Sequence, residues 1–190
     1  LETSLTGIGN IAIGYQAMGD TDAGTSSNDS DHNIAIGTLA MSGAWADVKC
    51  EYNVAIGNYA LDANTTANNN TAVGANALGA NTTGTERVAI GVESSYGSDT
   101  ESDNTVSMGY RSMYMNDATS ADATDSVAIG HEAMLADAAT SASLISNTAV
   151  GKGALRISAT TTGAVNYNAA VGTQALGADA NTTGSVQYNA

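Results

Sequence analysis

The sequence predicts an all-β protein built as a parallel β-solenoid, in which the chain winds in coils that stack along one axis. Two observations predict this fold. A short box centred on a glycine recurs along all 190 residues, and the residues before that glycine are β-branched or small. Repeats of about 20 residues are typical of solenoids. We therefore expect about nine coils of 17–23 residues.

The repeat is defined by its glycine, which follows an apolar run and ends it. A tight turn at this position explains why the residue does not vary, because glycine adopts backbone angles that other residues avoid. A helical repeat is disfavoured, since a fixed glycine within Val and Ile is unfavourable in a helix. The predicted turn glycines are Gly14, Gly37, Gly57, Gly74, Gly91, Gly109, Gly130, Gly151 and Gly172.

A short strand is predicted just before each glycine. The residue three before it is mostly β-branched, which favours strands, and the residue two before it is always Ala or Ser. The residue one before it is always large and apolar, and we expect this row to fill the interior of each coil. The predicted core row is Ile13, Ile36, Ile56, Val73, Ile90, Met108, Ile129, Val150 and Val171.

Neither face of the predicted strand is polar, and a strand that is apolar on both faces is normally covered on both. If the large residues fill the coil, the Ala/Ser face needs another cover. We expect identical chains to supply it, because small side chains allow backbones to approach closely near a symmetry axis. The sequence therefore predicts association with identical chains.

Composition excludes several partners. The formal net charge is −14 and the pI is about 4.1, which argues against nucleic acid and anionic lipid. The longest uncharged stretch, between Arg156 and Asp179, contains several Thr and Asn residues and predicts no membrane insertion. Cys50 is the single cysteine, so disulfides do not hold the fold, and we interpret this thiol as incidental.

The two ends of the sequence both match the middle of a repeat. Tyr188, Asn189 and Ala190 match the opening of the preceding box, and residues 1–7 resemble the close of a coil. We therefore expect residues 1–190 to be one repetitive array, cut from a longer chain inside a repeat at both ends.

The box N-(T/I/V)-A-(V/I)-G-x-x-A-(L/M) is followed in places by ANTTG, as at residues 80–84 and 180–184. This combination resembles the YadA-like head repeat of trimeric autotransporter adhesins and the repeat shafts of phage and viral tail fibres. The resemblance covers essentially the whole chain. It implies a left-handed parallel β-roll and a homotrimer, so that the partners of each chain are two identical chains.

Motifs for catalysis are weak. Gly151-Lys152-Gly153 is too short for a phosphate loop, and His131-Glu132 lacks the second His of a zinc metalloprotease helix. His32 and His131 stand about five repeats apart, so a shared metal site is not expected. We predict that the protein is not an enzyme and holds neither cofactor nor metal.

Acidic loops leave two alternatives to this prediction. Alternating acids occur at Asp20 with Asp22, at Asp29 with Asp31, and at Asp99, Glu101 and Asp103, and such oxygen clusters can hold calcium. Paired carboxylates also hydrolyse polysaccharides in glycosidases, which would make the chain a glycan-degrading tail spike. A solvated acidic loop is the favoured interpretation, because EF-hand spacing is absent and loop acids flanked by Ser, Thr and Ala have little to raise a carboxyl pKa.

Three further patterns are interpreted structurally. The Thr pairs, such as Thr65-Thr66, miss several repeats and do not make an ice-binding face. The Asn-x-Thr sequences at Asn64, Asn81 and Asn181 follow the repeat rather than marking glycosylation. The Asn that opens six boxes is expected to form a ladder between coils. The candidate recognition loop contains Trp45, Lys49 and Tyr52, which combine an indole with a cation.

The sequence thus predicts the structural shaft of a trimeric extracellular fibre. A phage or virus tail fibre that holds or presents receptor-binding elements is preferred, and a cell-surface trimeric adhesin is the alternative. The expected location is extracellular, on a virion or a cell surface. A host-surface glycan or protein is a further candidate partner.

Overall fold

A computed structural model describes residues 7–19, 30–43, 49–97, 103–115, 123–136, 143–157 and 164–177. Across these ranges the regular structure consists of three-residue β-strands, and no helix occurs in them. Each strand lies directly before one of the repeated glycines. The strands are β1 (Ile11–Ile13), β2 (Ile34–Ile36), β3 (Val54–Ile56), β4 (Thr71–Val73), β5 (Val88–Ile90), β6 (Val106–Met108), β7 (Val127–Ile129), β8 (Thr148–Val150) and β9 (Ala169–Val171).

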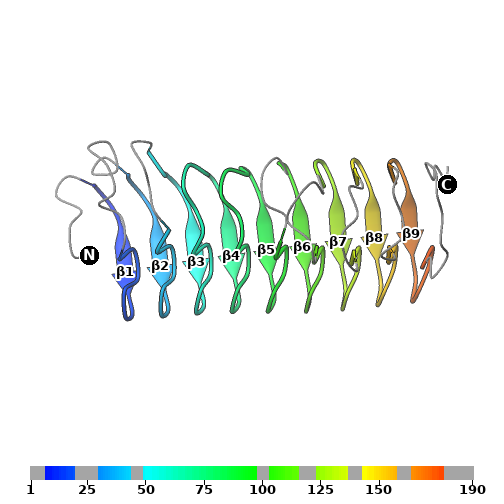
Figure 1. Ribbon diagram of the computed structural model, residues 1–190, viewed down its shortest axis with the longest axis horizontal. Coiled ribbons are helices and arrows are strands. Elements are labelled where there is room, and N and C mark those ends of the chain that lie inside the picture. Colours follow the sequence, from blue (N-terminus) through cyan, green and yellow to red (C-terminus); the bar gives the residue numbers. More distant parts are fainter. Residues whose placement is uncertain are drawn as a thin grey trace.

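The strands form one parallel sheet in sequence order, stacked along the long axis of the molecule (Figure 1). Every pair is in repeat register, so that the central residue of one strand faces the central residue of the next, as Ala35 faces Ala55. We call the stretch from one strand to the next a coil. The predicted parallel β-solenoid is confirmed, because only a chain that returns to the same face after each coil makes this order.

The repeated glycines form a row at the ends of the strands, with φ between 123° and 140°. A side chain has no room there: a Cβ on Gly57 would lie 2.4 Å from the carbonyl oxygen of Gly74 in the next coil. The turn therefore requires glycine for its backbone angle and for the close approach of neighbouring coils.

Two further residues of each turn have left-handed backbone angles although they carry side chains. The residue two after the glycine and the residue four after it have φ near 50–58° wherever they are not glycine, as in Tyr59 and Leu61. Hydrogen bonds between coils hold them there, for example from the Leu61 N–H to the Ala77 carbonyl at 3.1 Å. These bonds offset the roughly 1–2 kcal/mol that a left-handed residue costs.

The prediction for the two faces of the strand was wrong. The central Ala or Ser of β2 to β9 is buried inside the coil, whereas the large residues beside it point outward and are exposed or half-buried. Ile56, expected inside, is 38 % exposed, and Ala55 is 0 % exposed. The outward row comprises the predicted core residues Ile13, Ile36, Ile56, Val73, Ile90, Met108, Ile129, Val150 and Val171.

The reason for this reversal is the narrow interior of the coil. Ser107, at the centre of β6, lies 2.7 Å from the Ser94 hydroxyl on the opposite wall, measured between the two oxygens. Walls this close leave room only for Ala or Ser at the strand centre. In all coils but that of β5, a Met or Leu stands four after the glycine; Met41 and Leu78 are examples, and both are fully buried farther along the coil.

The Asn residues that open the boxes form a buried ladder. The Asn33 side-chain oxygen accepts the Asn53 backbone N–H at 2.9 Å, and the Asn53 oxygen accepts that of Asn70 at 3.0 Å. A second run joins Asn147 to Asn168 at 3.0 Å. The ladder predicted from the sequence is therefore present, and it satisfies backbone groups that the turn leaves unpaired.

Candidate functional site

The predicted recognition loop is described only in part. Trp45 lies outside the described residues. Lys49 is exposed and its Nζ lies 4.0 Å from a Glu51 carboxylate oxygen. Tyr52 stacks on His32, with ring centroids 5.2 Å apart and planes inclined by 17°. Lys49 and Tyr52 thus have partners in the frame of the solenoid, and their joint role in recognition stays a prediction.

The acidic residues that are described support the backbone. Asp103 accepts the Thr85 backbone N–H at 2.7 Å, and Asp31 accepts that of Ile8. The other members of the alternating acidic runs lie outside the described residues. Within the described ranges, no group of three or more His, Cys, Asp or Glu side chains is arranged to hold a metal ion.

The weak sequence motifs occupy turns of the solenoid. His131-Glu132 follows the glycine of the β7 coil, and Gly151-Lys152-Gly153 spans the same turn after β8. A metalloprotease motif lies on a helix and a phosphate loop leads into one, and neither applies to these turns. His131 packs beside Tyr110, with ring centroids 5.3 Å apart.

Three residues that could be modified are closed to solvent. Asn64 and Asn81, which belong to Asn-x-Thr sequences, are fully buried, and each bonds to the backbone three residues on. Cys50 is also buried, and desolvation raises the pKa of its thiol to about 12, so that little reactive thiolate forms. Asn181 lies outside the described residues.

Exposed aromatic and charged residues gather on the turns after β5 to β8. Arg111 donates from Nε to a Glu93 carboxylate oxygen at 2.6 Å, and its guanidinium lies 5.2 Å from the Tyr110 ring centroid and 5.0 Å from that of Tyr114. Tyr114 in turn stacks on Tyr96 with centroids 5.7 Å apart. The hydrogen bond to Glu93 raises the Arg111 pKa, so this group is a fixed cation.

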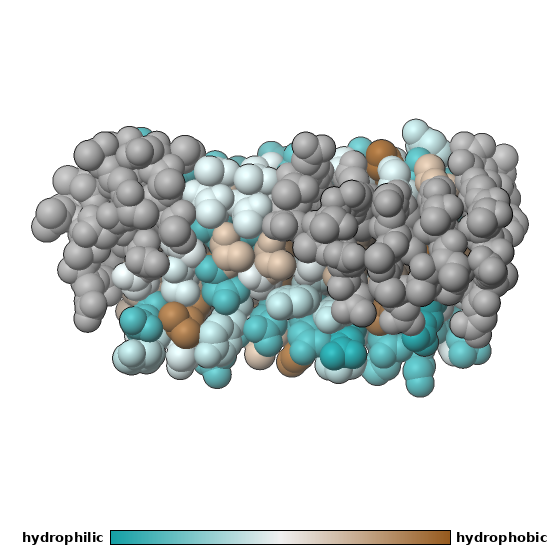
Figure 2. Space-filling model, in the orientation of Figure 1, coloured by the Kyte–Doolittle hydropathy of each residue, from teal (hydrophilic) through white to brown (hydrophobic). Residues whose placement is uncertain are grey.

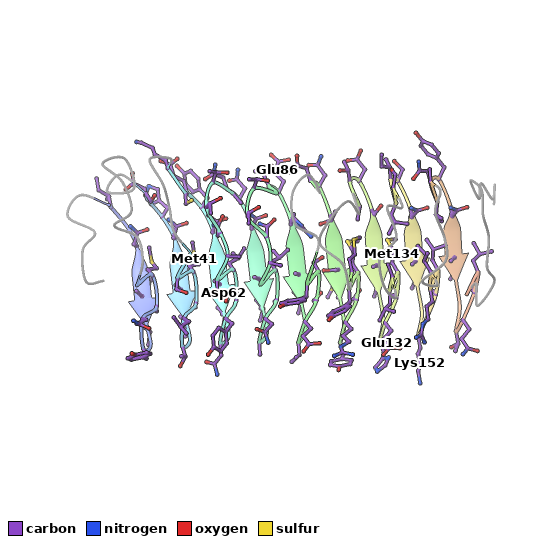
Figure 3. The ribbon with its side chains drawn as sticks, in the orientation of Figure 1. Met41, Asp62, Glu86, Glu132, Met134 and Lys152 are labelled. Atoms are coloured by element: carbon purple, nitrogen blue, oxygen red, sulfur yellow. The ribbon has the colours of Figure 1, made fainter. Side chains whose placement is uncertain are left out.

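A recess lined by acidic and basic side chains lies on the turns after β7, β8 and β9. Its volume is about 260 Å³, and it is lined by Glu132, Lys152, Gly153, Arg156, Gln174 and Gly177. Figure 3 shows Glu132 and Lys152 side by side on adjacent turns, at the opposite end of the strands from Glu86. On the face drawn in Figure 2, the described residues of that edge are mostly hydrophilic.

Sequence reasoning placed these turns in solvent but did not select them as a site. A usable signal was present, because three of the five Lys and Arg residues fall just after a repeated glycine: Arg111, Lys152 and Arg156. The stacking of coils brings Lys152 beside Arg156 and Glu132. This proximity becomes apparent only when successive copies of the repeat are placed one above the other.

The outward row forms a regular apolar feature on the sheet surface. Its large apolar side chains recur once per strand, and Ile90, Met108 and Ile129 are 37 %, 40 % and 38 % exposed. A contiguous apolar patch of this kind on a protein surface typically marks an interaction site.

No family model, curated protein or solved structure matches the chain. Within the described residues, no helix has the length and apolar character needed to cross a membrane.

Proposed function

We propose that this chain is the structural shaft of a trimeric extracellular fibre, of the kind that holds the receptor-binding parts of a phage or virus tail fibre away from the particle. The proposal rests on the outward row of large apolar residues. In the proposed shaft, nine coils wind left-handed, as the resemblance to YadA-like repeats implies, and the row faces the other chains.

The spacing of the row favours identical chains as its cover. Neighbouring parallel strands lie about 4.8 Å apart, so the row repeats with that period along the whole sheet. A partner that matches it at every step needs the same period, and a second copy of this chain has it. The number of chains, three, follows from the resemblance.

The backbone geometry suits a stiff rod. Each coil bonds to the next through the strand, the Asn ladder and the turn, as in the bonds from Tyr59 N–H to the Thr38 carbonyl and from Gly57 N–H to the Ile36 carbonyl. Such a stack resists bending and protease attack because opening one coil breaks bonds to both of its neighbours.

The test compares two exposed apolar positions of similar accessibility. Ile56→Asp places a charge in the outward row, whereas Tyr59→Asp, at a residue 42 % exposed on the turn, places the same charge beside it. Light scattering should give three times the 18.9 kDa chain mass for the parent and for Tyr59→Asp. Ile56→Asp should dissociate into folded single chains, because a carboxylate buried at the interface lacks a partner.

Two results would overturn the proposal. A parent that is a stable monomer would show that the row needs no cover. An Ile56→Asp protein that keeps the mass of three chains would show that the chains associate through another surface.

A further inference from the structure

We propose that the recess between the turns after β7, β8 and β9 binds a carboxylated sugar, with Lys152 and Arg156 as the groups that hold the carboxylate. This binding site goes beyond a shaft function and is formed within one chain. It lies on the turns beyond the glycines, at the end of the strands, and does not include the outward row.

The recess exists because of Gly153. In all the other coils, the residue two after the repeated glycine carries a side chain. Glu132 and Gln174 hold this position in the coils on either side of Gly153. A Cβ on Gly153 would meet only the Gln174 side chain, at 3.7 Å, so the missing side chain leaves open space between two filled turns. A recess of about 260 Å³ is slightly smaller than the roughly 300 Å³ of the smallest drug-sized pockets and suits one sugar ring.

The walls of the recess are held in place by the backbone ladder. The Gly153 N–H donates to the His131 carbonyl at 2.9 Å, and the Gln174 N–H donates to the Lys152 carbonyl at 2.8 Å. These bonds fix three successive turns relative to one another. The side chains that line the recess therefore start from a preorganised frame, which lowers the entropy cost of binding.

The charges in the recess favour a single negative charge on the ligand. Arg156 lies 3.8 Å from Glu132, measured from Nη1 to the carboxylate oxygen, and His131 lies 3.9 Å from the same oxygen. Within the described part of the chain, Lys152 has no carboxylate within ion-pair distance. A carboxylate thus finds a cation in Lys152, whereas Glu132 repels ligands with several negative charges.

The remaining groups match sugar hydroxyls. Glu132 offers acceptor oxygens, and the Gln174 amide both donates and accepts. The chain as a whole is acidic, but charges farther away than about 8 Å are screened at physiological ionic strength. A local pair of cations can therefore attract a carboxylate on a chain with net charge −14.

The experiment titrates the assembled protein with two carboxylated sugars and two neutral ones, and follows the binding by calorimetry. Galacturonate, which carries one carboxylate, represents uronic acids, and sialyllactose represents sialic acids, so the preferred source of the carboxylate is identified. Galactose and lactose are the matching neutral controls. We expect at least one acidic sugar to bind and both neutral sugars to bind at least about tenfold more weakly, as loss of a charge-assisted bond requires.

Three variants locate the site. Lys152→Gln should weaken binding about tenfold. Gly153→Gln should abolish binding without changing the charge, because the new side chain fills the recess. The turn can hold this residue, since Gln174 occupies the equivalent position of the next coil with φ 56°. Lys49→Gln is the control, because it removes the same charge from an exposed lysine far from the recess. Its binding affinity should stay within about twofold of that of the parent, well below the tenfold loss expected for Lys152→Gln.

The proposal is overturned if neither acidic sugar binds, if the neutral sugars bind equally well, or if Lys49→Gln weakens binding as much as Lys152→Gln does. Light scattering of each variant separates this test from that of the shaft. Loss of binding at an unchanged mass concerns the recess alone, and a changed mass concerns the assembly.

Discussion

The interior of the solenoid changes its chemistry at β5 and β6. The apolar core consists mainly of Ala, Met and Leu, in one cluster that ends at Ala89 in β5 and another that begins at Met113 after β6. Between the two clusters, serine replaces Ala, Met or Leu at four repeat positions, and Arg87 and Thr105 hold ladder positions that are Asn in most coils. We call the buried residues Arg87, Ser94, Ser95, Thr105, Ser107 and Ser112 the polar segment.

The backbone pairing is the same in the polar segment as in the rest of the sheet. The strand register continues without a shift from Ala89 through Ser107 to Ala128. The serine hydroxyls find partners instead: the Ser95 and Ser107 oxygens lie 3.0 Å apart, and Ser112 donates to the Ala128 carbonyl at 2.6 Å. The fold is therefore specified by glycine turns and stacked backbone bonds, and its interior accepts polar residues that satisfy one another.

Arg87 occupies the ladder position that Asn holds in six other coils, and its side chain is fully buried. Its Nε donates to the Thr105 hydroxyl at 3.1 Å and its Nη1 donates to the Asn81 side-chain oxygen at 3.0 Å. Burial lowers the pKa of the guanidinium to about 10, while the charge of Asp103 acts in the opposite direction.

The largest effect is expected for Arg87→Ala. The change leaves a cavity and removes the partner of the Thr105 hydroxyl, so unfolding free energy should fall by about 3–5 kcal/mol. Arg87→Met keeps most of the volume and removes the buried charge, and its effect should stay within about 1 kcal/mol. Denaturant unfolding at one fixed chain concentration measures both variants.

Hydrogen exchange adds a local measurement, because solenoid stability is a sum over neighbouring coils. Protection of the Val88 and Val106 amides should fall in Arg87→Ala and persist in Arg87→Met. If the Met variant is as unstable as the Ala variant, the hydrogen bonds of Arg87 hold this segment rather than its volume.

We call the core cluster from Ala17 to Ala89 the apolar segment. A smaller loss of stability is expected when the apolar segment and the polar segment are each changed at the same repeat position. Leu61 and Ser95 both lie four after a repeated glycine, both are buried, and both have φ near 50°. Leu61→Ala should lower unfolding free energy by about 3 kcal/mol, because it opens a cavity. Ser95→Ala loses the hydrogen bonding of its hydroxyl, including the bond with Ser107, and should cost about 1 kcal/mol.

These two variants are compared in the same unfolding assay. Equal losses would show that the serine network stabilises its coil as much as apolar packing does. In that event, the two segments differ in composition but not in the free energy that each coil contributes.

The sequence was sufficient to predict the solenoid, its parallel stacking and its turns, because these depend on a pattern repeated in every coil. Glycine after each strand and Asn before it report backbone geometry directly. The assignment of strand faces failed for a different reason. Alternation shows that Ile56 and Ala55 point in opposite directions, but not which of them points inward, since that depends on the distance between walls.

The recess was missed because it arises from an exception to the repeat. Alignment of the copies draws attention to what they share, and Gly153 differs at a position where the side chain varies from coil to coil. Its significance depends on the residues above and below it in the stack, Glu132 and Gln174, which stand about one coil away in the sequence.

The apolar segment also contains an ionisable group that burial affects. Asp62 lies just after Leu61, and desolvation raises the pKa of its carboxyl to about 6, although backbone N–H groups of Asp62 and Ala63 oppose the shift. In the unfolded chain the carboxyl titrates near 3.8. Between these values the folded protein binds the proton and the unfolded chain does not, so this carboxyl lowers stability as pH rises from about 4 to 6.

A gain in stability is therefore expected from Asp62→Asn, which removes the charge and keeps the shape. At pH 7 the variant should be more stable than the parent by about 1–2 kcal/mol, a value reduced for the partial exposure of the carboxyl. At pH 4 the two proteins should be equally stable, because the parent's carboxyl is then protonated in the fold. Denaturant midpoints at both pH values measure the difference, and a gain that is the same at pH 4 and pH 7 would assign it to a new amide hydrogen bond rather than to the lost charge.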